Sequence, residues 1–132
     1  MEILKRINVN LKGKKVTIVG TGILVGKPAA ILAMNKQATV TTCNIHTKNL
    51  KSECLDSDII ICGAGQKDLI TKDMVSENVI VIDAGVDYKD GKTYGDVKFD
   101  EVKEKASYIT PTPGGLGPIT VAKLFENLVQ IS

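Results

Sequence analysis

The sequence predicts an α/β fold, a doubly wound and mostly parallel sheet with helices on both faces. Three observations support this prediction. Apolar runs rich in Val and Ile recur along the 132 residues, helical patterns separate these runs, and glycines follow several of them. Continuous apolar runs are typical of strands covered on both faces, and the alternation of strand and helix is typical of a parallel sheet.

The individual elements follow from periodicity and from turn residues. We expect strands at residues 15–19, 39–43, 58–62, 79–83 and 108–110. We expect helices at residues 2–7, 24–35, 49–55, 71–75, 100–105 and 119–130. The segment DYKDGKTYGDV interrupts the alternation, and its Asp90-Gly91 pair predicts a tight hairpin turn.

Length, composition and charge limit the classes of protein to which the chain can belong. The length fits one domain, and 43% apolar with 24% charged residues is ordinary for a globular protein. A net charge of +2 without a basic cluster argues against nucleic acid, and no apolar run is long enough for a membrane span. We therefore expect a cytoplasmic protein. The spacing of Cys43, Cys54 and Cys62 predicts reduced packing residues and no metal site.

The stretch VTIVGTGILVGKP, residues 16–28, runs from a strand through three glycines into a helix. Gly20 can form the tight turn, Gly22 can allow close approach of a diphosphate, and Gly26 can let the helix pack on the strand. Pro28 suits the first helical turn. The third glycine comes one residue later than in GxGxxG, so a purely structural turn is the alternative. The context favours a Rossmann-like dinucleotide site.

The second strand ends in TTCNIHT, without the carboxylate that usually binds the ribose of NAD and without an arginine for a 2′-phosphate. His46, Lys48 and Lys51 could supply positive charge nearby, or they could be ordinary surface residues.

Small residues also follow the third and fourth strands. Gly63, Gly65 and Gly85 could let a flat cofactor lie across the sheet edge, or they could form ordinary turns. Asp83, at the end of an apolar strand, needs a partner if it is buried, and we expect it to be a structural hydrogen-bond acceptor.

The loop before the last helix, within ITPTPGGLGPITVAKLFENL, holds three prolines and three glycines in residues 111–118. A plain connection needs fewer such residues, so this pattern favours a loop that faces a ligand over a purely structural one.

Three segments carry a family resemblance: VGKPAAILAMNKQATVTTCNIHT, VIVIDAGVDYKDGKTYGDV and YITPTPGGLGPITVAKLFENL. They resemble the nucleotide-binding domain of the bifunctional methylenetetrahydrofolate dehydrogenase/cyclohydrolases, the FolD family. The resemblance implies a domain that holds NADP or NAD while the enzyme oxidises 5,10-methylenetetrahydrofolate to the methenyl form and hydrolyses that to 10-formyltetrahydrofolate. It also implies a homodimer, because the family dimerises through its nucleotide domains.

The resemblance implies site residues position by position, and the glycine loop contributes Gly26 together with its neighbour Val25. The expected cofactor-binding set is Gly20, Thr21, Gly22, Val25, Gly26, Ile45, Gly63, Ala64, Ala84, Val86 and Thr120. The expected substrate-binding set, bordering the folate, is Pro113, Gly114, Gly115 and Gly117.

Two positions depart from the family pattern. The family usually has GRS where this chain has Gly20-Thr21-Gly22, and CHS where it has Cys43-Asn44-Ile45. The missing Arg and Ser would bind a 2′-phosphate, because a guanidinium pairs with phosphate in a forked geometry. NAD in place of NADP is therefore a hypothesis for this chain.

In the family, a Tyr and a Lys four residues later, on a helix of a preceding domain, provide the chemistry. Tyr88 and Lys92 have this spacing, but Asp90-Gly91 places a turn between them, so we expect no catalytic residue here. The chain is expected to be one NAD(P)-binding domain whose catalytic folate-binding domain lies elsewhere. A stand-alone NAD(P)-binding or sensing module is the alternative, and a different nicotinamide-dependent oxidoreductase leaves the PTPGGLGP loop unexplained.

Overall fold

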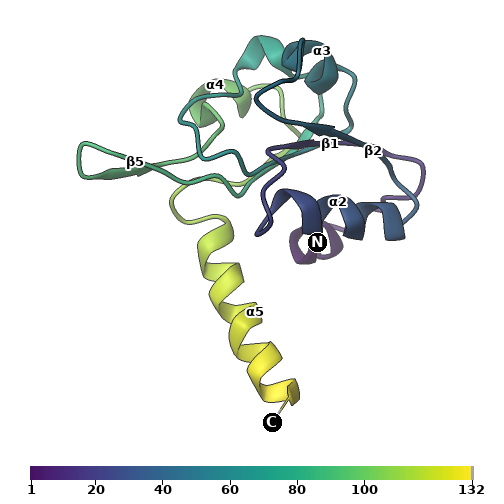
Figure 1. Ribbon diagram of the computed structural model, residues 1–132, viewed down its shortest axis with the longest axis vertical. Coiled ribbons are helices and arrows are strands. Elements are labelled where there is room, and N and C mark those ends of the chain that lie inside the picture. The colour runs from purple at the N-terminus through teal and green to yellow at the C-terminus, as the bar shows by residue number, and fades with distance from the viewer. Residues whose placement is uncertain (132) are drawn as a thin grey trace.

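The computed structural model describes residues 1–131, without the side chains of Val121 and Ile131, and it contains one central sheet of five parallel strands (Figure 1). The strand order is β2-β1-β3-β4-β7. The strands are β1 (Lys15–Val19), β2 (Thr39–Cys43), β3 (Ile59–Cys62), β4 (Ile80–Asp83) and β7 (Tyr108–Ile109). The predicted doubly wound parallel sheet is therefore confirmed.

Helices cover both faces of this sheet, with α1 and α2 on one side and α3 and α4 on the other (Figure 1). Alternate residues of the strands face the two layers, so that Val16 and Ile18 pack with α1 and α2 while Val19 packs with α3. The helices are α1 (Glu2–Arg6), α2 (Gly26–Asn35), α3 (Leu50–Leu55), α4 (Phe99–Val102) and α5 (Leu116–Ile131).

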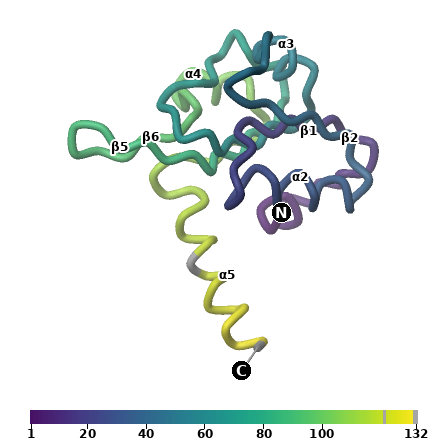
Figure 2. The backbone as a smooth tube through the Cα atoms, viewed as in Figure 1, coloured from purple at the N-terminus to yellow at the C-terminus, as the bar shows by residue number. Residues whose placement is uncertain are grey.

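Two elements extend away from the layered body. The hairpin of β5 (Asp87–Lys89) and β6 (Lys92–Tyr94) projects on one side, and α5 projects with its C-terminal end far from the sheet (Figures 1 and 2). The hairpin turn is confirmed, because Asp90 and Gly91 have φ angles of 51° and 75°. Both positive angles belong to the turn type that matches the twist of paired strands.

Most helices and strands begin and end within a few residues of their predicted bounds, but the prediction of one helix was wrong. Residues 71–75 form only the 3-10 turn Lys72–Met74, because Thr71 and Val75 on either side are extended. Val75 is fully buried, so burial of its side chain on the sheet ends the turn. Helix α5 begins at Leu116 and not at residue 119, since Pro118 in a first helical turn needs no hydrogen-bond acceptor.

The three cysteines are free and buried, as the sequence predicts. Burial raises the pKa of Cys54 to about 12, and burial together with the Asp83 carboxylate raises the pKa of Cys62 well above its usual range.

Within residues 1–131, no helix has the length and apolar character that a membrane span requires.

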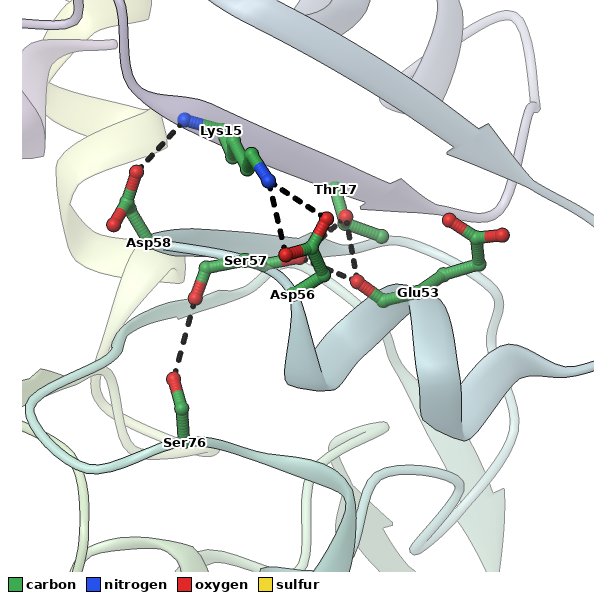
Figure 3. Close-up of polar contacts among 7 residues, drawn as sticks. All are labelled: Lys15, Thr17, Glu53, Asp56, Ser57, Asp58 and Ser76. Atoms are coloured by element: carbon green, nitrogen blue, oxygen red, sulfur yellow. Dashed lines mark hydrogen bonds and ion pairs between the residues drawn. The ribbon is translucent and has the colours of Figure 1, made fainter.

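A buried polar contact fixes α3 to the sheet (Figure 3). The hydroxyl oxygens of Thr17 in β1 and Ser57 before β3 are 2.5 Å apart, and the Ser57 hydroxyl donates to the Glu53 carbonyl at 2.7 Å. Both side chains are buried, so loss of either partner leaves the other hydroxyl with a single hydrogen bond, to the Glu53 carbonyl, in an apolar layer. The contact therefore sets the distance between α3 and the β1–β3 pair.

Replacing Ser57 by alanine should lower the free energy of unfolding by about 1–2 kcal/mol, because Thr17 then keeps only a 3.3 Å bond to the Glu53 carbonyl. Urea denaturation measures the change. Ser76→Ala is the matched control, since the Ser76 hydroxyl makes only a long 3.4 Å bond to the Ser57 carbonyl, and it should cost less than about 0.5 kcal/mol. Equal losses in the two variants would contradict this account.

Candidate functional site

The sheet reverses its direction of growth between β1 and β3. Strand β2 lies on one side of β1, and β3, β4 and β7 follow on the other. In open α/β sheets, ligands bind beyond the carboxyl ends of the strands at such a switch point. The residues directly after these two strand ends are Gly20 and Gly63, both in the predicted cofactor-binding set.

Gly20 lies where the ends of three strands converge. Its N–H donates to the Cys43 carbonyl of β2 at 2.9 Å, and its φ angle is +96°. A Cβ at this position would lie 2.6 Å from the Gly63 carbonyl oxygen. Both the backbone conformation and the space therefore require glycine, and the turn predicted for Gly20 is present.

The segment from Gly20 to α2 leaves backbone N–H groups open. Among the hydrogen bonds of the described residues, none uses the N–H of Thr21, Gly22 or Ile23 as a donor. These amides precede a helix of ten residues, whose N-terminus carries partial positive charge. Such an arrangement has the chemistry to bind a diphosphate.

Gly22 and Gly26 are glycines for different reasons. A Cβ at Gly22 would meet no atom within 4 Å, so the protein itself leaves this position open. A Cβ at Gly26 would overlap the carbonyl of Gly20, so Gly26 lets α2 begin against the loop backbone. The sequence predicted that Gly26 lets this helix pack on the strand. Helix α2 does pack on Val16 and Ile18 of β1, and the atoms next to Gly26 itself belong to the turn that follows the strand.

Side chains of the loop after β2 accept hydrogen bonds from backbone N–H groups of the same loop. The Asn44 side chain accepts from the N–H of His46 at 2.8 Å, and the Thr47 hydroxyl accepts from the N–H of Asn44 at 2.8 Å. These bonds present Ile45 outward with 93% of its surface exposed. Lys51 pairs with Asp73 at 3.2 Å, so its charge is partly balanced.

Asp83, at the end of β4, is a buried structural acceptor as predicted. One carboxylate oxygen accepts from the N–H groups of Gly85 and Asp96 at 2.9 and 3.2 Å, and the other accepts from Val97 at 3.0 Å. Burial raises the pKa of Asp83, the three N–H donors oppose that rise, and the neighbouring Asp96 carboxylate adds to it. The acid therefore ties β4 to the segment after the hairpin.

Asp96 is a residue that sequence reasoning missed. It is fully buried, and it accepts from the N–H of Ala64 at 2.6 Å and of Gln66 at 2.8 Å. A Cβ at Gly85 would overlap the Asp96 carboxyl group, which gives Gly85 a structural reason to be glycine. The available signal was an acid between Gly95 and Val97 at the end of an otherwise polar hairpin.

A groove of about 540 Å³ lies between α1, α2 and α5 at the carboxyl ends of β3 and β4. Val25, Ala84 and Thr120 of the predicted cofactor-binding set line it, and most of its wall is apolar. The Thr120 hydroxyl donates to the Leu116 carbonyl at 3.0 Å, which leaves its oxygen able to accept. Ile45, on the edge-strand side, and Val86, 62% exposed after β4, do not line this groove.

The residues predicted to border a folate form the turn into α5. Gly114 has a φ angle of +102°, and a Cβ at Gly115 would overlap the Pro111 carbonyl. Gly117, in the first turn of α5, has open space where a Cβ would lie. Pro113, Gly114 and Gly117 are exposed, so the loop presents backbone and proline ring to solvent.

Tyr88 and Lys92 do not form a catalytic pair. Tyr88 pairs with Thr93 across the hairpin, and Lys92 pairs with Lys89. Cross-strand partners share a face while successive residues alternate, so the side chains of Tyr88 and Lys92 lie on opposite faces. Among the side chains of the described residues, no group of three or more His, Cys, Asp or Glu could hold a metal ion.

Residues 1–132 match the family model of the tetrahydrofolate dehydrogenase/cyclohydrolase NAD(P)-binding domain. The bifunctional protein FolD of Fusobacterium nucleatum is 48% identical over 130 residues, which are 98% of this chain and 46% of that protein. The chain thus spans about half the length of the curated relatives it matches.

Solved structures of FolD enzymes share the fold of this chain. The bifunctional FolD enzyme of Campylobacter jejuni superposes with a TM-score of 0.95 at 46% identity, over 98% of this chain and 46% of that one. The FolD of Trypanosoma brucei, complexed with NADP cofactor and inhibitor, has a TM-score of 0.92 at 36% identity, over 98% of this chain and 46% of that one.

Replacement of Gly22 and of Gly26 by alanine should have different effects on the free energy of unfolding. Gly26→Ala should destabilise the chain by about 3 kcal/mol, because the new methyl group overlaps the Gly20 carbonyl. Gly22→Ala should change the free energy of unfolding by less than about 0.5 kcal/mol, because its methyl group enters open space. Thermal and urea unfolding measure both. A destabilised Gly22→Ala variant would show that other atoms pack against position 22, which contradicts the open space around it.

Proposed function

The chain belongs to the tetrahydrofolate dehydrogenase/cyclohydrolase family and forms its NAD(P)-binding domain, and from this premise we propose that it serves a folate dehydrogenase. In the proposed reaction, a hydride leaves the methylene carbon of 5,10-methylenetetrahydrofolate, and the product is the methenyl form. Bound NAD(P) supplies the hydride acceptor. Hydrolysis of the methenyl bridge to 10-formyltetrahydrofolate by the whole enzyme belongs to the same proposal.

The open amides of Thr21, Gly22 and Ile23 at the switch point carry this proposal. They fit a diphosphate because Gly22 has no side chain between ligand and backbone and because α2 adds its dipole. We assign the diphosphate to Gly20, Thr21 and Gly22, with Val25 and Gly26 at the start of the helix. The remaining cofactor contacts are proposed for Ile45, Gly63, Ala64, Ala84, Val86 and Thr120.

The folate is proposed to border the loop that begins α5. Pro113, Gly114, Gly115 and Gly117 lack long side chains, so a flat ring could approach their backbone closely. The hydride donor and acceptor must be held within contact distance, and a loop without long side chains leaves that space open. The catalytic groups would come from a folate-binding domain outside residues 1–132.

The family resemblance also supports a homodimer and a cytoplasmic location as parts of the proposal. Tetrahydrofolate would be shared between this domain and the folate-binding domain. A stand-alone NAD(P)-binding or sensing module remains the competing function, and the two differ in whether turnover appears once the other half of a FolD enzyme is supplied.

The cofactor is proposed to be NAD in preference to NADP. Thr21 and Ile45 offer no charge to a 2′-phosphate, and the single arginine of the sequence, Arg6, lies in α1 and pairs with Glu2 at 3.1 Å. A 2′-phosphate would therefore lack the forked guanidinium partner that such sites use.

Calorimetric titration of the chain with NAD and with NADP tests the cofactor site. NAD should bind at least as tightly as NADP, and Gly22→Val should weaken NAD binding by at least about tenfold, because its side chain keeps the diphosphate from the amides. Asn35→Ala, at the exposed far end of the same helix, is the control and should leave the affinity unchanged. Much tighter binding of NADP would refute the NAD assignment.

A chimera tests the division of labour. The chain, joined to the half of the Campylobacter jejuni FolD enzyme that it does not match, should reduce NAD when 5,10-methylenetetrahydrofolate is added, whereas the isolated chain should not. Formation of reduced nicotinamide is followed by absorbance. Turnover by the isolated chain would refute the proposed division, and cofactor binding without turnover in the chimera would favour the sensing module.

A further inference from the structure

Thr110 joins the loop before α5 to the central sheet. It directly follows the short strand β7, and its side chain is buried. Its hydroxyl accepts from the N–H of Asp83 at 2.8 Å, and its own N–H donates to the Val81 carbonyl at 3.2 Å. Asp83 and Val81 both belong to β4. Thr110 therefore extends the contact between the chain and β4 past the end of the β4–β7 pairing.

The bonds of Thr110 are the last hydrogen bonds between this loop and the sheet. Among the hydrogen bonds of the described residues, none joins residues 111–115 to a strand. The next attachment is apolar, because Leu116 and Ile119 of α5 pack on the core layer that contains α1 and α2. The segment 111–115 is thus held by Thr110 at one end and by α5 at the other.

The loop also folds back on Thr110. A Cβ at Gly115 would overlap the Pro111 carbonyl, and it would lie 3.0 Å from the Cβ of Thr110. Gly115 belongs to the set that is proposed to border the folate. Because the backbone at Gly115 rests against Thr110 and Pro111, its place relative to the sheet depends on the place of Thr110.

Asp83 connects this loop with the end of the hairpin. Its N–H holds Thr110, while its carboxylate accepts from the N–H groups of Asp96 and Val97. A Cβ at Gly95 would overlap an Asp83 carboxylate oxygen, and it would lie 2.9 Å from the Thr112 hydroxyl oxygen. The loop, the hairpin end and β4 therefore meet at Asp83 without a side chain between them at position 95.

The neighbouring wall of the groove is held by a different bond. Ala84 lines the groove, and its N–H donates to the Cys62 carbonyl at 2.8 Å. This bond ties Ala84 to β3 and does not involve Thr110. Loss of the Thr110 hydroxyl should therefore move the loop and leave Ala84 in place.

We propose that Thr110 is a positioning residue for the hydride transfer, because its hydroxyl sets where the folate-bordering loop stands relative to the groove at Ala84. This proposal rests on the proposed function. The rate of a transfer between two bound molecules depends steeply on how they are held against each other. A displaced loop should thus lower the turnover of the folate without weakening the binding of the cofactor.

Thr110→Val tests this role in the chimera with the other half of the Campylobacter jejuni FolD enzyme. Valine keeps the branched shape and removes the acceptor of the Asp83 N–H. The kcat/KM for 5,10-methylenetetrahydrofolate should fall by about tenfold, and the Kd for NAD, from calorimetry, should stay within about twofold of wild type. Thr110→Ser keeps the hydroxyl and should restore kcat/KM to within about threefold of wild type.

Thr17→Val is the matched control, because it removes a hydroxyl that is also buried but lies in β1 and contacts Ser57 near α3. Its kcat/KM should stay within about twofold of wild type. A merely structural role for Thr110 predicts equal losses in the two valine variants, and that result would overturn the proposal. A Thr110→Ser variant as impaired as Thr110→Val would overturn it as well. Where Thr110→Val does not fold, Thr110→Ala serves for the same comparisons.

Amide hydrogen exchange on the isolated chain tests the bond itself without turnover. The N–H of Asp83 should exchange slowly in the wild type and in Thr110→Ser, and at least about tenfold faster in Thr110→Val. Equal exchange of this N–H in the wild type and in Thr110→Val would refute the positioning role, whatever the chimera does. If the bond is present but the wild-type chimera binds NAD without turnover, the proposed function fails, and the positioning role fails with it.

Discussion

The contact between two strand ends, at Gly20 and Gly63, is the constraint on which the site depends. The two residues follow neighbouring strands of the sheet, and a single methyl group on Gly20 would lie 2.6 Å from the Gly63 carbonyl oxygen. Because no side chain separates them, the chain can turn directly from β1 into α2, and the N–H groups of that turn stay at the surface. The open N-terminal end of α2 follows from this close approach.

The sheet and the glycine loop could be predicted because local chemistry determines them. The bounds of β1 and β2 agree with the predicted residues, since their β-branched runs end at turn residues on both sides. The hairpin turn follows from Asp90 and Gly91, which tolerate the positive φ angles that the turn requires. Asp83 was predictable as a structural acceptor because a buried acid at the end of an apolar strand must find donors.

The rest depends on contacts that join distant parts of the chain. Asp96 bonds the N–H of Ala64, 32 residues earlier, and nothing local marks that acid as buried. The reason for glycine at position 85 is equally non-local, because Asp96 fills the space. The 3-10 turn before Val75 replaced a predicted helix because burial of Val75 on the sheet overrides a weak local pattern. Helix α5 begins before residue 119 because Pro118 is tolerated in a first helical turn. The apolar periodicity of the sequence does not reveal this start, because Gly117 and Pro118 interrupt it.

The proposed role of this domain, to bind and orient the cofactor, fits the chemistry of the groups at the carboxyl edge of the sheet. The carboxylates of Asp83 and Asp96 are buried and occupied by backbone N–H donors, and burial keeps the Cys62 thiol protonated. The Thr120 hydroxyl donates to its own helix. His46 follows the edge strand β2, which β1 and β3 separate from β4. A general acid or base must reach the reacting bond directly or through one water, and none of these groups is free to do so at the groove. The proposed hydride transfer makes no such demand on the domain, because it requires only that donor and acceptor be held together, and backbone amides, glycines and a mostly apolar wall are suited to that task.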